Sequence, residues 1–324
     1  MRYLVTGGLG FIGHNVVRLL EDLGHECIVV DTFTTYGFIP ASEITYLTSL
    51  RQKRIKSEVY KVDIRDKTLI ESLVLNNEVD VIIHLASFPR QKVVDQDPLL
   101  ASDVMCNGLV NLLEIARRHC SKFVYVSSSM VYGDFYNDTT EYKNPNPIGQ
   151  YGIMKLMGER LVEDYGRQGH FAYSIVRPSA VYGEYDVEDR VVSKFLTAAM
   201  RGETLRVKGA GEVLDFTHVN DTAQGIVLAA ILDKANSNTY NITRASTKMW
   251  TLKEAAELAI EIAGQGELEI LDRDLTFPKR GRLGISKAQT ELGYTPTINF
   301  EQGMQQYYDW YQQNPVLWRG SSVH

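Results

Sequence analysis

The chain has 324 residues, of which 44% are hydrophobic and 23% charged, and its formal net charge at pH 7 is −6. That length predicts two domains, or one large α/β unit with an appendage, and the composition is ordinary for a globular protein. The negative charge argues against a nucleic acid as the main partner. Glycines interrupt the apolar N-terminus, so no signal peptide is expected, and no stretch approaches the ~20 apolar residues of a membrane span. The three cysteines have no metal-like spacing and are typical of reduced thiols in a cytoplasmic protein, with no metal site expected.

Short runs rich in valine and isoleucine alternate with longer stretches of helical period in the first 178 residues. Apolar runs without polar alternation suit strands that are buried on both faces. Their alternation with helices predicts an α/β fold with a doubly wound parallel sheet of Rossmann type. The predicted strands cover 2–6, 27–31, 59–63, 79–86, 122–128 and 173–178, and the predicted helices cover 11–24, 66–76, 98–119 and 149–168.

After residue 178 the alternation loosens, with helical patterns at 188–202, 220–232, 251–263 and 300–312 and β-like runs at 213–219 and 239–243. We expect a nucleotide-binding domain over residues 1–178, to which residues 213–236 return. A smaller C-terminal α/β domain over 179–324 should pack over the strand ends, where such sheets bind ligands. The basic run at 51–56 is expected to be a solvated helix face.

A glycine loop follows the first predicted strand and opens the first helix, with Gly7, Gly10 and Gly13 in the sequence "TGGLGFIG". A pyrophosphate needs free backbone N–H groups at such a helix start, and a Cβ there would block its approach. Asp31 closes the second strand, where its carboxylate can accept hydrogen bonds from the adenosine ribose hydroxyls. The same carboxylate would repel a 2′-phosphate, so the pattern predicts NAD rather than NADP as the cofactor.

Tyr151 and Lys155 lie one turn apart on one face of the predicted helix at 149–168. A free tyrosine has a pKa near ~10, and lowering it by about three units needs roughly 4 kcal/mol of preference for the phenolate. Lys155 and the positive nicotinamide ring can supply that preference together. A serine at the end of a central strand, in the run 127–129, would hold the substrate hydroxyl. The set predicts a proton-handling centre.

The glycine spacing, with Phe11 and Ile12 before the last glycine, resembles that of the extended short-chain dehydrogenase/reductase family, in particular its nucleotide-sugar epimerases and dehydratases. The resemblance continues along nearly the whole chain. It is carried by "VDIRD" (62–66), "HLAS" (84–87), "SSSMVYG" (127–133), "YGIMK" (151–155), "RPSAVYG" (177–183), "DFTHVNDTAQGI" (215–226) and "ISKAQTELGY" (285–294).

The resemblance implies roles for individual residues. Ser128 falls where the family places its catalytic serine or threonine, Ser129 becomes a substrate contact and Ser127 a structural one. Asp63 would meet the adenine amino group and Ile64 the adenine edge. Further cofactor contacts are implied for Phe11, Ile12, Leu85, Ala86, Ser87 and Asn107, the last at the position of a helix asparagine of the family.

Ser129 and Met130 bear on the reaction. The family's dehydratases carry an Asp-Glu pair, or at least a glutamate, directly after the catalytic Ser/Thr, and neither residue here can exchange protons in that way. The resemblance therefore favours an NAD-dependent epimerase of a nucleotide-activated sugar, acting at C4 through a transient keto sugar. A reductase or dehydrogenase of a keto sugar or other carbonyl, and a non-catalytic dinucleotide-binding regulator, remain as alternatives.

Two departures from the family concern the substrate, with Ala180 in place of an asparagine and Leu214 in place of an arginine that face the nucleotide phosphates. A charge-assisted phosphate contact is worth ~1.5–3 kcal/mol, so these losses matter. Substrate-binding cations that can compensate are Arg90, Lys208 and either Arg280 or Arg282; the alternative for each is a plain surface charge.

The resemblance also implies a homodimer in which the helices at 98–119 and 149–168 of each subunit pack as a four-helix bundle. The first of these helices carries more apolar residues than one buried side needs. The alternative is that the helix is simply well buried on its own sheet. The apolar residues concerned are Leu109, Val110, Leu112, Leu113 and Ile115.

Overall fold

The main sheet has seven strands, all parallel, in the computed structural model, which describes residues 1–34 and 39–319. Its order is β11-β6-β5-β4-β1-β2-β3, so the direction of winding reverses between β1 and β4. The central strands are buried on both faces, as their continuous apolar sequences predicted. The strands are β1 (Arg2–Thr6), β2 (Glu26–Asp31), β3 (Glu58–Lys61), β4 (Val81–His84), β5 (Lys122–Val126), β6 (Ala172–Pro178) and β11 (Asn238–Ile242).

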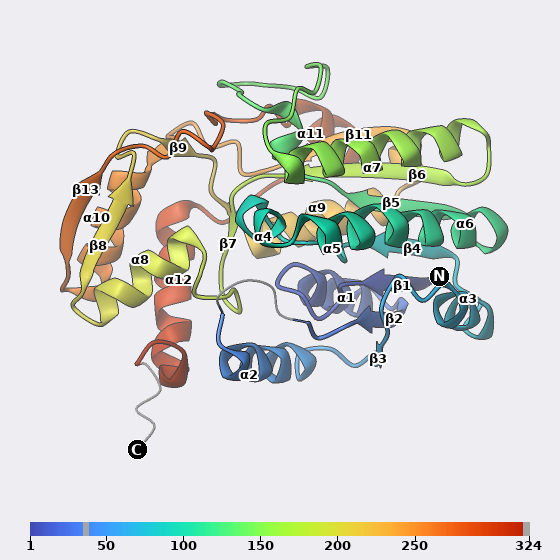
Figure 1. Cartoon of the computed structure of the whole chain (residues 1–324), viewed down its shortest axis with the longest axis horizontal. Helices are drawn as coiled ribbons and strands as arrows, with labels where there is room; N and C mark the ends of the chain where they lie inside the picture. Colours follow the sequence, from blue (N-terminus) through green and yellow to red (C-terminus); the bar gives the residue numbers. More distant parts are fainter. Residues whose placement is uncertain (35–38, 320–324) are drawn as a thin grey trace.

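Helices cover both faces of this sheet, which confirms the doubly wound fold (Figure 1). On one face lie α1 (Gly13–Asp22), α9 (Val219–Ile231) and α11 (Ser286–Leu292). On the other lie α3 (Lys67–Asn76), α6 (Leu109–His119) and α7 (Gln150–Arg167). Because α9 and β11 come from residues beyond 178, the sheet and its covering layers are not made from the N-terminal half alone.

A C-terminal lobe with its own apolar core stands beside the carboxyl ends of the strands (Figure 1). The predictions for this lobe need correction: the run 213–219 is divided between two short strands, and the strands at 204–208, 250–251 and 267–271 were missed. The lobe contains α8 (Val191–Met200), α10 (Leu252–Ala263), α12 (Phe300–Gln313), the parallel pair β8 (Thr204–Lys208) and β13 (Glu267–Leu271), and the antiparallel pair β9 (Val213–Leu214) and β12 (Trp250–Thr251). The parallel pair β7 (Val181–Tyr182) and β10 (Thr217–His218) connects it to the sheet.

The helix between β2 and β3, α2 (Ala41–Gln52), packs on the C-terminal lobe and lies beside α12 (Figure 1). Its Leu47 is fully buried in the core of that lobe. The basic run that begins at the end of α2 is not a solvated face as predicted, because Arg51 is only 6% exposed. Lys53 and Lys56 of the same run are exposed.

The predicted helix at 98–119 is three elements: α5 (Pro98–Ser102), a π-helical segment η1 (Asp103–Gly108) and α6. By length and composition Pro98–His119 is apolar enough to cross a membrane, contrary to the prediction that no stretch would be, but half of its most apolar window is buried inside the protein. A core helix meets the same criteria, and α6 packs on α3 and α7. The remaining short elements are α4 (Gln91–Gln96), η2 (Ser129–Tyr132), η3 (Asp233–Ala235) and η4 (Pro315–Leu317).

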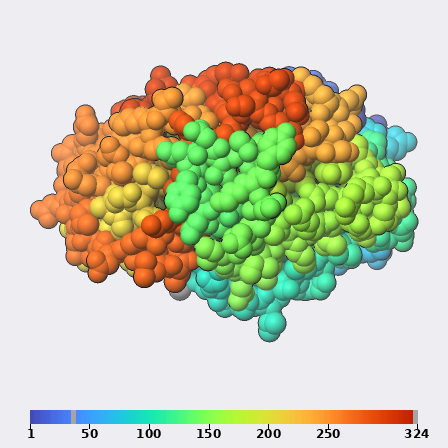
Figure 2. Space-filling view, turned by 90° about the horizontal axis from the view of Figure 1, so that it is seen from above, coloured from blue at the N-terminus to red at the C-terminus, as the bar shows by residue number. Residues whose placement is uncertain are grey.

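The segment between η2 and α7 lies across the surface. Figure 2 shows it in green between the orange C-terminal residues and the yellow-green of α7. The amide of Phe135 donates to the carbonyl of Lys279, the Lys279 amide donates to the Asp134 carboxylate, and Thr139 bridges to Leu283. These bonds attach the stretch that carries Arg280 and Arg282 to the N-terminal part of the chain.

Candidate functional site

A cleft of about 970 Å³ opens between the carboxyl ends of the sheet strands and the C-terminal lobe. This is the position at which ligands bind in open α/β sheets, next to the point where the strand order reverses. Its walls bring together the glycine loop (residues 7–13), Asp31, the serine run at 127–129, Tyr151 and Lys155. The volume lies at the upper end of the range for small-molecule sites, which suits a dinucleotide with a second ligand.

The glycine loop turns from β1 into α1 with Gly7 at a φ of +68°. A Cβ on Gly13 would lie 2.2 Å from the Gly7 carbonyl oxygen, and one on Gly10 would lie 2.9 Å from it. These glycines are therefore required by the protein's own backbone, in addition to the predicted access for a pyrophosphate. Gly7, Gly10, Phe11, Ile12 and Gly13 all line the cleft.

Asp31 ends β2 at the cleft, and its carboxylate accepts hydrogen bonds from the amides of Leu9 (3.1 Å) and Phe33 (2.9 Å). Burial raises the pKa of this carboxyl group, while the two amides and the nearby Arg51 lower it. A carboxylate can accept about four hydrogen bonds, so the group can still accept from ribose hydroxyls as predicted.

Other predicted cofactor contacts also reach the cleft, namely Asp63, Ile64, Leu85, Ala86 and Ser87. The Asp63 carboxylate is held by the guanidinium of Arg65 at 2.7 Å.

Asn107 was predicted to contact the cofactor, but it does not line the cleft. The π-helical segment η1 turns its side chain outward, where it is exposed and donates to Asp103 at 2.8 Å. Val104 of the same segment lines the cleft instead.

The predicted catalytic side chains converge from two neighbouring elements. Ser128 precedes η2 at the end of β5, and its hydroxyl accepts from the Met130 amide at 3.2 Å. Tyr151 lies in the first turn of α7, where its amide donates to the Gln91 side chain at 3.1 Å. The Tyr151 phenol bonds to the Ser128 hydroxyl. The parallel sheet and the following helix thus deliver the serine and the tyrosine to one point.

Burial dominates the electrostatics of Tyr151 and Lys155. It raises the pKa of the Tyr151 phenol above its usual value of 10, although the bond with Ser128 lowers it. It lowers the pKa of Lys155 to about 7, against the opposing effect of Glu159. The Lys155 ammonium donates to the Val126 carbonyl at 2.9 Å and lies 6.0 Å from the centre of the Tyr151 ring. A phenolate at Tyr151 therefore needs a further positive charge in the cleft, which the nicotinamide ring would bring.

A buried ion pair supports this arrangement from behind. Arg177 of β6 binds both oxygens of Glu159, at 2.8 and 2.6 Å, one turn beyond Lys155. Its remaining nitrogen donates to the Tyr132 hydroxyl at 2.8 Å, in η2 next to the serine run. Arg177 thus holds the helix of Tyr151 and the segment of Ser128 in fixed relation.

The other two serines of the run differ in their surroundings. Ser129 donates to the Ser179 hydroxyl at 3.0 Å, a partner that the sequence did not suggest. The Ser127 hydroxyl is buried and has no hydrogen-bond partner among the described residues. All three serines line the cleft, as does Ser179.

Cations gather in the half of the cleft that faces the C-terminal lobe. Arg90 is paired with Asp189, and burial lowers its pKa to about 10. Lys208 and Arg280 line the cleft and make no ion pair with any described residue. Lys92 of α4, which was missed, is equally unpaired, and its pKa is lowered by burial and by Lys194 and Lys208. Sequence reasoning had no signal for Lys92, because no motif contains it.

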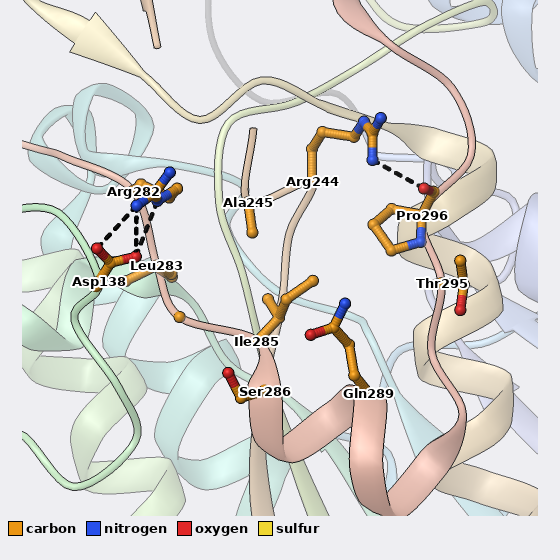
Figure 3. A pocket seen from close by; sticks show the side chains of 11 residues that line it. Asp138, Arg244, Ala245, Arg282, Leu283, Ile285, Ser286, Gln289, Thr295 and Pro296 are labelled. Carbon is orange, nitrogen blue, oxygen red and sulfur yellow. Dashed lines mark hydrogen bonds and ion pairs between the residues drawn. The ribbon is translucent and has the colours of Figure 1, made fainter. Parts of the chain in front are cut away.

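Arg282 does not belong to this group, so its prediction as a substrate-binding residue is wrong. It lines a separate cavity of about 310 Å³, where its guanidinium is paired with Asp138 at 2.7 Å (Figure 3). The second arginine of that cavity, Arg244, turns to the Pro296 carbonyl at 2.8 Å (Figure 3). Gly281 separates Arg280 from Arg282 and packs against the backbone of Tyr136, which leaves the two arginines on different sides.

Both departures from the family pattern lie on the cleft wall. Ala180 has a φ of +43°, in the left-handed region. Leu214 is 5% exposed and belongs to the apolar core of the C-terminal lobe with Phe216 and Trp250. An arginine at 214 would have to leave that core.

Comparison with known proteins agrees with this geometry. Residues 3–243 match the model of the NAD dependent epimerase/dehydratase family. A protein of Methanocaldococcus jannaschii described as a putative UDP-glucose 4-epimerase is 30% identical, over 96% of this chain and 98% of its own. UDP-glucuronic acid decarboxylase 3 of Arabidopsis thaliana is also 30% identical, over 94% of this chain and 87% of its own.

Among solved structures, the UDP-glucuronic acid 4-epimerase of Bacillus cereus, in complex with UDP-glucuronic acid and NAD, superposes with a TM-score of 0.87. It is 27% identical, with 97% of this chain and 100% of that chain covered. The cofactor is therefore NAD, and the cleft fits it: Gly7, Gly10 and Gly13 carry no side chain that would cover the loop backbone, and Asp31 stands at the end of β2. Burial raises the pKa of the Tyr151 phenol, and the positive nicotinamide ring would act against that effect.

Proposed function

Because the chain belongs to the NAD-dependent epimerase/dehydratase family, we propose that it is an epimerase of a nucleotide-activated sugar, acting at C4. The observation that carries this proposal is the Ser128–Tyr151–Lys155 set at the cleft, followed in the chain by Ser129 and Met130. The set supports oxidation and reduction of a hydroxyl-bearing carbon.

Tyr151 would take the proton of the sugar hydroxyl, with Ser128 holding that oxygen in place. Bound NAD would supply the acceptor for the hydrogen at the same carbon and return it later. Lys155 would stabilise the Tyr151 phenolate through its charge, and Glu159 opposes the lowering of the Lys155 pKa by burial. When the keto sugar has turned over, Tyr151 returns the proton and the product is the C4 epimer.

Dehydration is disfavoured by the residues after Ser128. Ser129 is engaged with Ser179, and Met130 is 8% exposed and carries no ionisable group. Removal of water across a C–C bond needs an acid and a base beside the sugar, and these two positions offer neither.

The unpaired cations support a nucleoside diphosphate as the anchor of the substrate. Lys92, Lys208 and Arg280 come from three separate segments, line the cleft and make no ion pair with any described residue, although the charge of Asp274 acts on the two lysines and that of Glu212 on Arg280. A diphosphate would neutralise these cations. Arg280 would gain most from it, because burial disfavours its charged form and lowers its pKa to about 10. These groups would replace the contacts that Ala180 and Leu214 do not make.

The test is a panel of UDP-, GDP-, CDP- and dTDP-sugars, including UDP-glucose and UDP-glucuronic acid, followed by NMR. Appearance of the C4 epimer, with no steady change of absorbance at 340 nm, is expected. Release of CO₂ from UDP-glucuronic acid would make the enzyme a decarboxylase, and loss of water from dTDP-glucose a dehydratase. Continuous consumption of NADH would make it a reductase, and NAD binding without turnover of any sugar would favour a regulator.

We further propose a homodimer through α6 and α7, in a cytoplasmic enzyme. The apolar residues of α6 that were predicted to support this dimer mostly do not, because they are fully buried within the chain. They are Leu109, Leu112, Leu113 and Ile115. What remains exposed is Val110 at 37% and Ile153 of α7 at 54%. Sedimentation at micromolar concentration should give twice the chain mass, and the mass of one chain would reject the dimer.

A further inference from the structure

Arg51, at the end of α2, joins the two halves of the cleft. One nitrogen of its guanidinium donates to the carbonyl of Leu9 in the glycine loop at 3.2 Å. Two others donate to the carbonyl of Tyr185, at 3.1 and 2.6 Å. The planar fork of arginine allows such contacts with two separate carbonyl groups at once.

Leu9 is thereby held at both of its backbone groups. Its amide donates to the Asp31 carboxylate at 3.1 Å, and its carbonyl accepts from Arg51. Leu9 lies between the glycines that would face the cofactor pyrophosphate. The position of Arg51 therefore depends on the conformation of the glycine loop.

On the other side, Tyr185 belongs to the loop at 183–190 and has a φ of +70°, which is unfavourable for a side chain of this kind. The two hydrogen bonds from Arg51 hold that carbonyl in place. The same loop carries Asp186, Glu188, Asp189 and Arg190 along the wall of the cleft, and Asp189 pairs with Arg90.

Other residues in and after α2 also contact the glycine loop or the 183–190 loop. Glu43, in the first turn of α2, accepts from the Glu188 amide at 2.9 Å. Arg54 lies over the Tyr185 ring, 4.4 Å from its centre. Arg54 also contacts Nε2 of His14 at 2.9 Å, and Nδ1 of His14 lies 2.9 Å from the Gly10 carbonyl oxygen. Thus α2 and the residues after it contact the glycine loop and the 183–190 loop together.

The surroundings of Arg51 indicate more than simple packing. A buried cation is costly unless it is paired, yet the hydrogen-bond acceptors of Arg51 among the described residues are neutral carbonyls. The carboxylates of Asp186 and Asp31, one from each side of the cleft, stabilise its charge without touching it. The position of Arg51 is therefore set by groups from both halves.

We propose that Arg51 is a positioning residue that couples the two halves of the cleft, so that occupation of the adenosine and pyrophosphate part of the cofactor site orders the 183–190 loop beside the substrate. The proposal rests on the NAD site alone. It requires neither epimerisation nor a particular sugar nucleotide.

The test uses hydrogen exchange of the full chain, stripped of cofactor, with and without ADP-ribose. ADP-ribose carries the adenosine and pyrophosphate of NAD but lacks the nicotinamide, so it does not fill the part of the cofactor site nearest Tyr151. In the wild type, ADP-ribose should slow amide exchange at residues 7–13 and also at 184–190, by at least about threefold. In Arg51→Lys, which keeps the charge but loses the fork, only residues 7–13 should respond.

Lys53→Met is the matched control for Arg51→Gln, because each variant removes one positive charge at the end of α2 and Lys53 is exposed. It should respond at both segments as the wild type does. Arg51→Gln serves as the second variant if Arg51→Lys is too unstable, and melting temperatures of all variants identify a general loss of stability. A merely structural arginine would change the melting temperature and the basal exchange, but not the response to ADP-ribose.

Two results would overturn the coupling. One is a wild type in which ADP-ribose protects residues 7–13 but leaves 184–190 unchanged. The other is an Arg51 variant in which both segments still respond. Failure of the sugar-nucleotide panel would leave this experiment unaffected, because no sugar nucleotide is used in it.

Discussion

The two halves of the cleft are built in different ways. In the cofactor half, the residues come from continuous sequence motifs: the glycine loop, Asp31 and Ser128 follow or end strands of the sheet, and Tyr151 and Lys155 lie in the first turns of α7. In the substrate half, Lys92, Lys208 and Arg280 come from α4, β8 and the stretch after β13, and no motif contains them together.

This difference has a consequence for how each half tolerates change. The cofactor half uses single groups, each with one defined task, so the loss of one group should remove that task. The substrate half uses several cations whose charges add, so the loss of one should be shared by the rest. The predictions below test that contrast, from the largest expected effect to the smallest.

Tyr151→Phe should lower turnover by about 10²- to 10⁴-fold, the usual contribution of a positioned acid or base. The variant should still bind NAD, because only the phenolic oxygen is removed. Activity is measured on the substrate found in the sugar-nucleotide panel, and the amount of NAD bound to the purified protein is measured separately. Tyr136→Phe is the control, since Tyr136 is 68% exposed and outside the cleft. Full activity of Tyr151→Phe would exclude the proposed chemistry.

Lys155→Met should change the pH dependence of stability of the cofactor-free protein. Burial lowers the pKa of Lys155 to about 7 from its usual 10.5, so the unfolded chain binds more protons between these values. Below pH 7 the folded state carries the full free-energy cost of a protonated, buried Lys155. That cost decreases as the pH rises from 7 and is gone at pH 10.5. The stability of the wild type relative to Lys155→Met should therefore rise by up to about 1.4 kcal/mol per pH unit in this window.

Denaturant unfolding at several pH values measures this difference, with the exposed Lys53→Met as reference. A difference between wild type and Lys155→Met that stays constant from pH 7 to 10 would show that burial does not lower the pKa of Lys155.

Asp31→Asn should weaken NAD binding roughly tenfold, because one charged acceptor for the ribose is lost. Binding of NADP should improve relative to NAD, since the repulsion of the 2′-phosphate disappears. Titration calorimetry with both cofactors measures the ratio. Asp22→Asn, on the exposed side of α1, should change neither affinity. An unchanged NAD/NADP ratio in Asp31→Asn would mean that Asp31 does not face the ribose.

Lys92→Ala and Lys208→Ala should each raise KM only about two- to fivefold, because both side chains are exposed and solvent screens their charges. Their kcat values should be unchanged, and the double variant should show roughly the product of the two effects. Lys253→Ala, on α10 outside the cleft, is the control. A loss of turnover in either variant, with KM unaltered, would contradict a role in binding the diphosphate.

The doubly wound sheet and the cofactor half were predictable from the sequence because they depend on local patterns. Valine and isoleucine runs without alternation indicate strands buried on both faces, and parallel strands end at the same edge of their sheet. The glycine loop after β1, Asp31 at the end of β2 and Ser128 after β5 are therefore placed by chain order alone. Asn107 is the exception, because the π-helical η1 shifts the register of that helix and turns the side chain outward.

By itself, the sequence determined the fold class, the glycine loop at the first strand end and the placing of Tyr151 and Lys155 one turn apart on a helix, since each depends on residues that are near in the chain. Only the tertiary structure decided the rest. It separated Arg280 from Arg282, brought Lys92 to Lys208 and placed Arg51 of a basic run inside the protein between Leu9 and Tyr185. Whether a cation is solvated, paired or free to bind a ligand depends on what packs against it, and these neighbours are far away in the sequence.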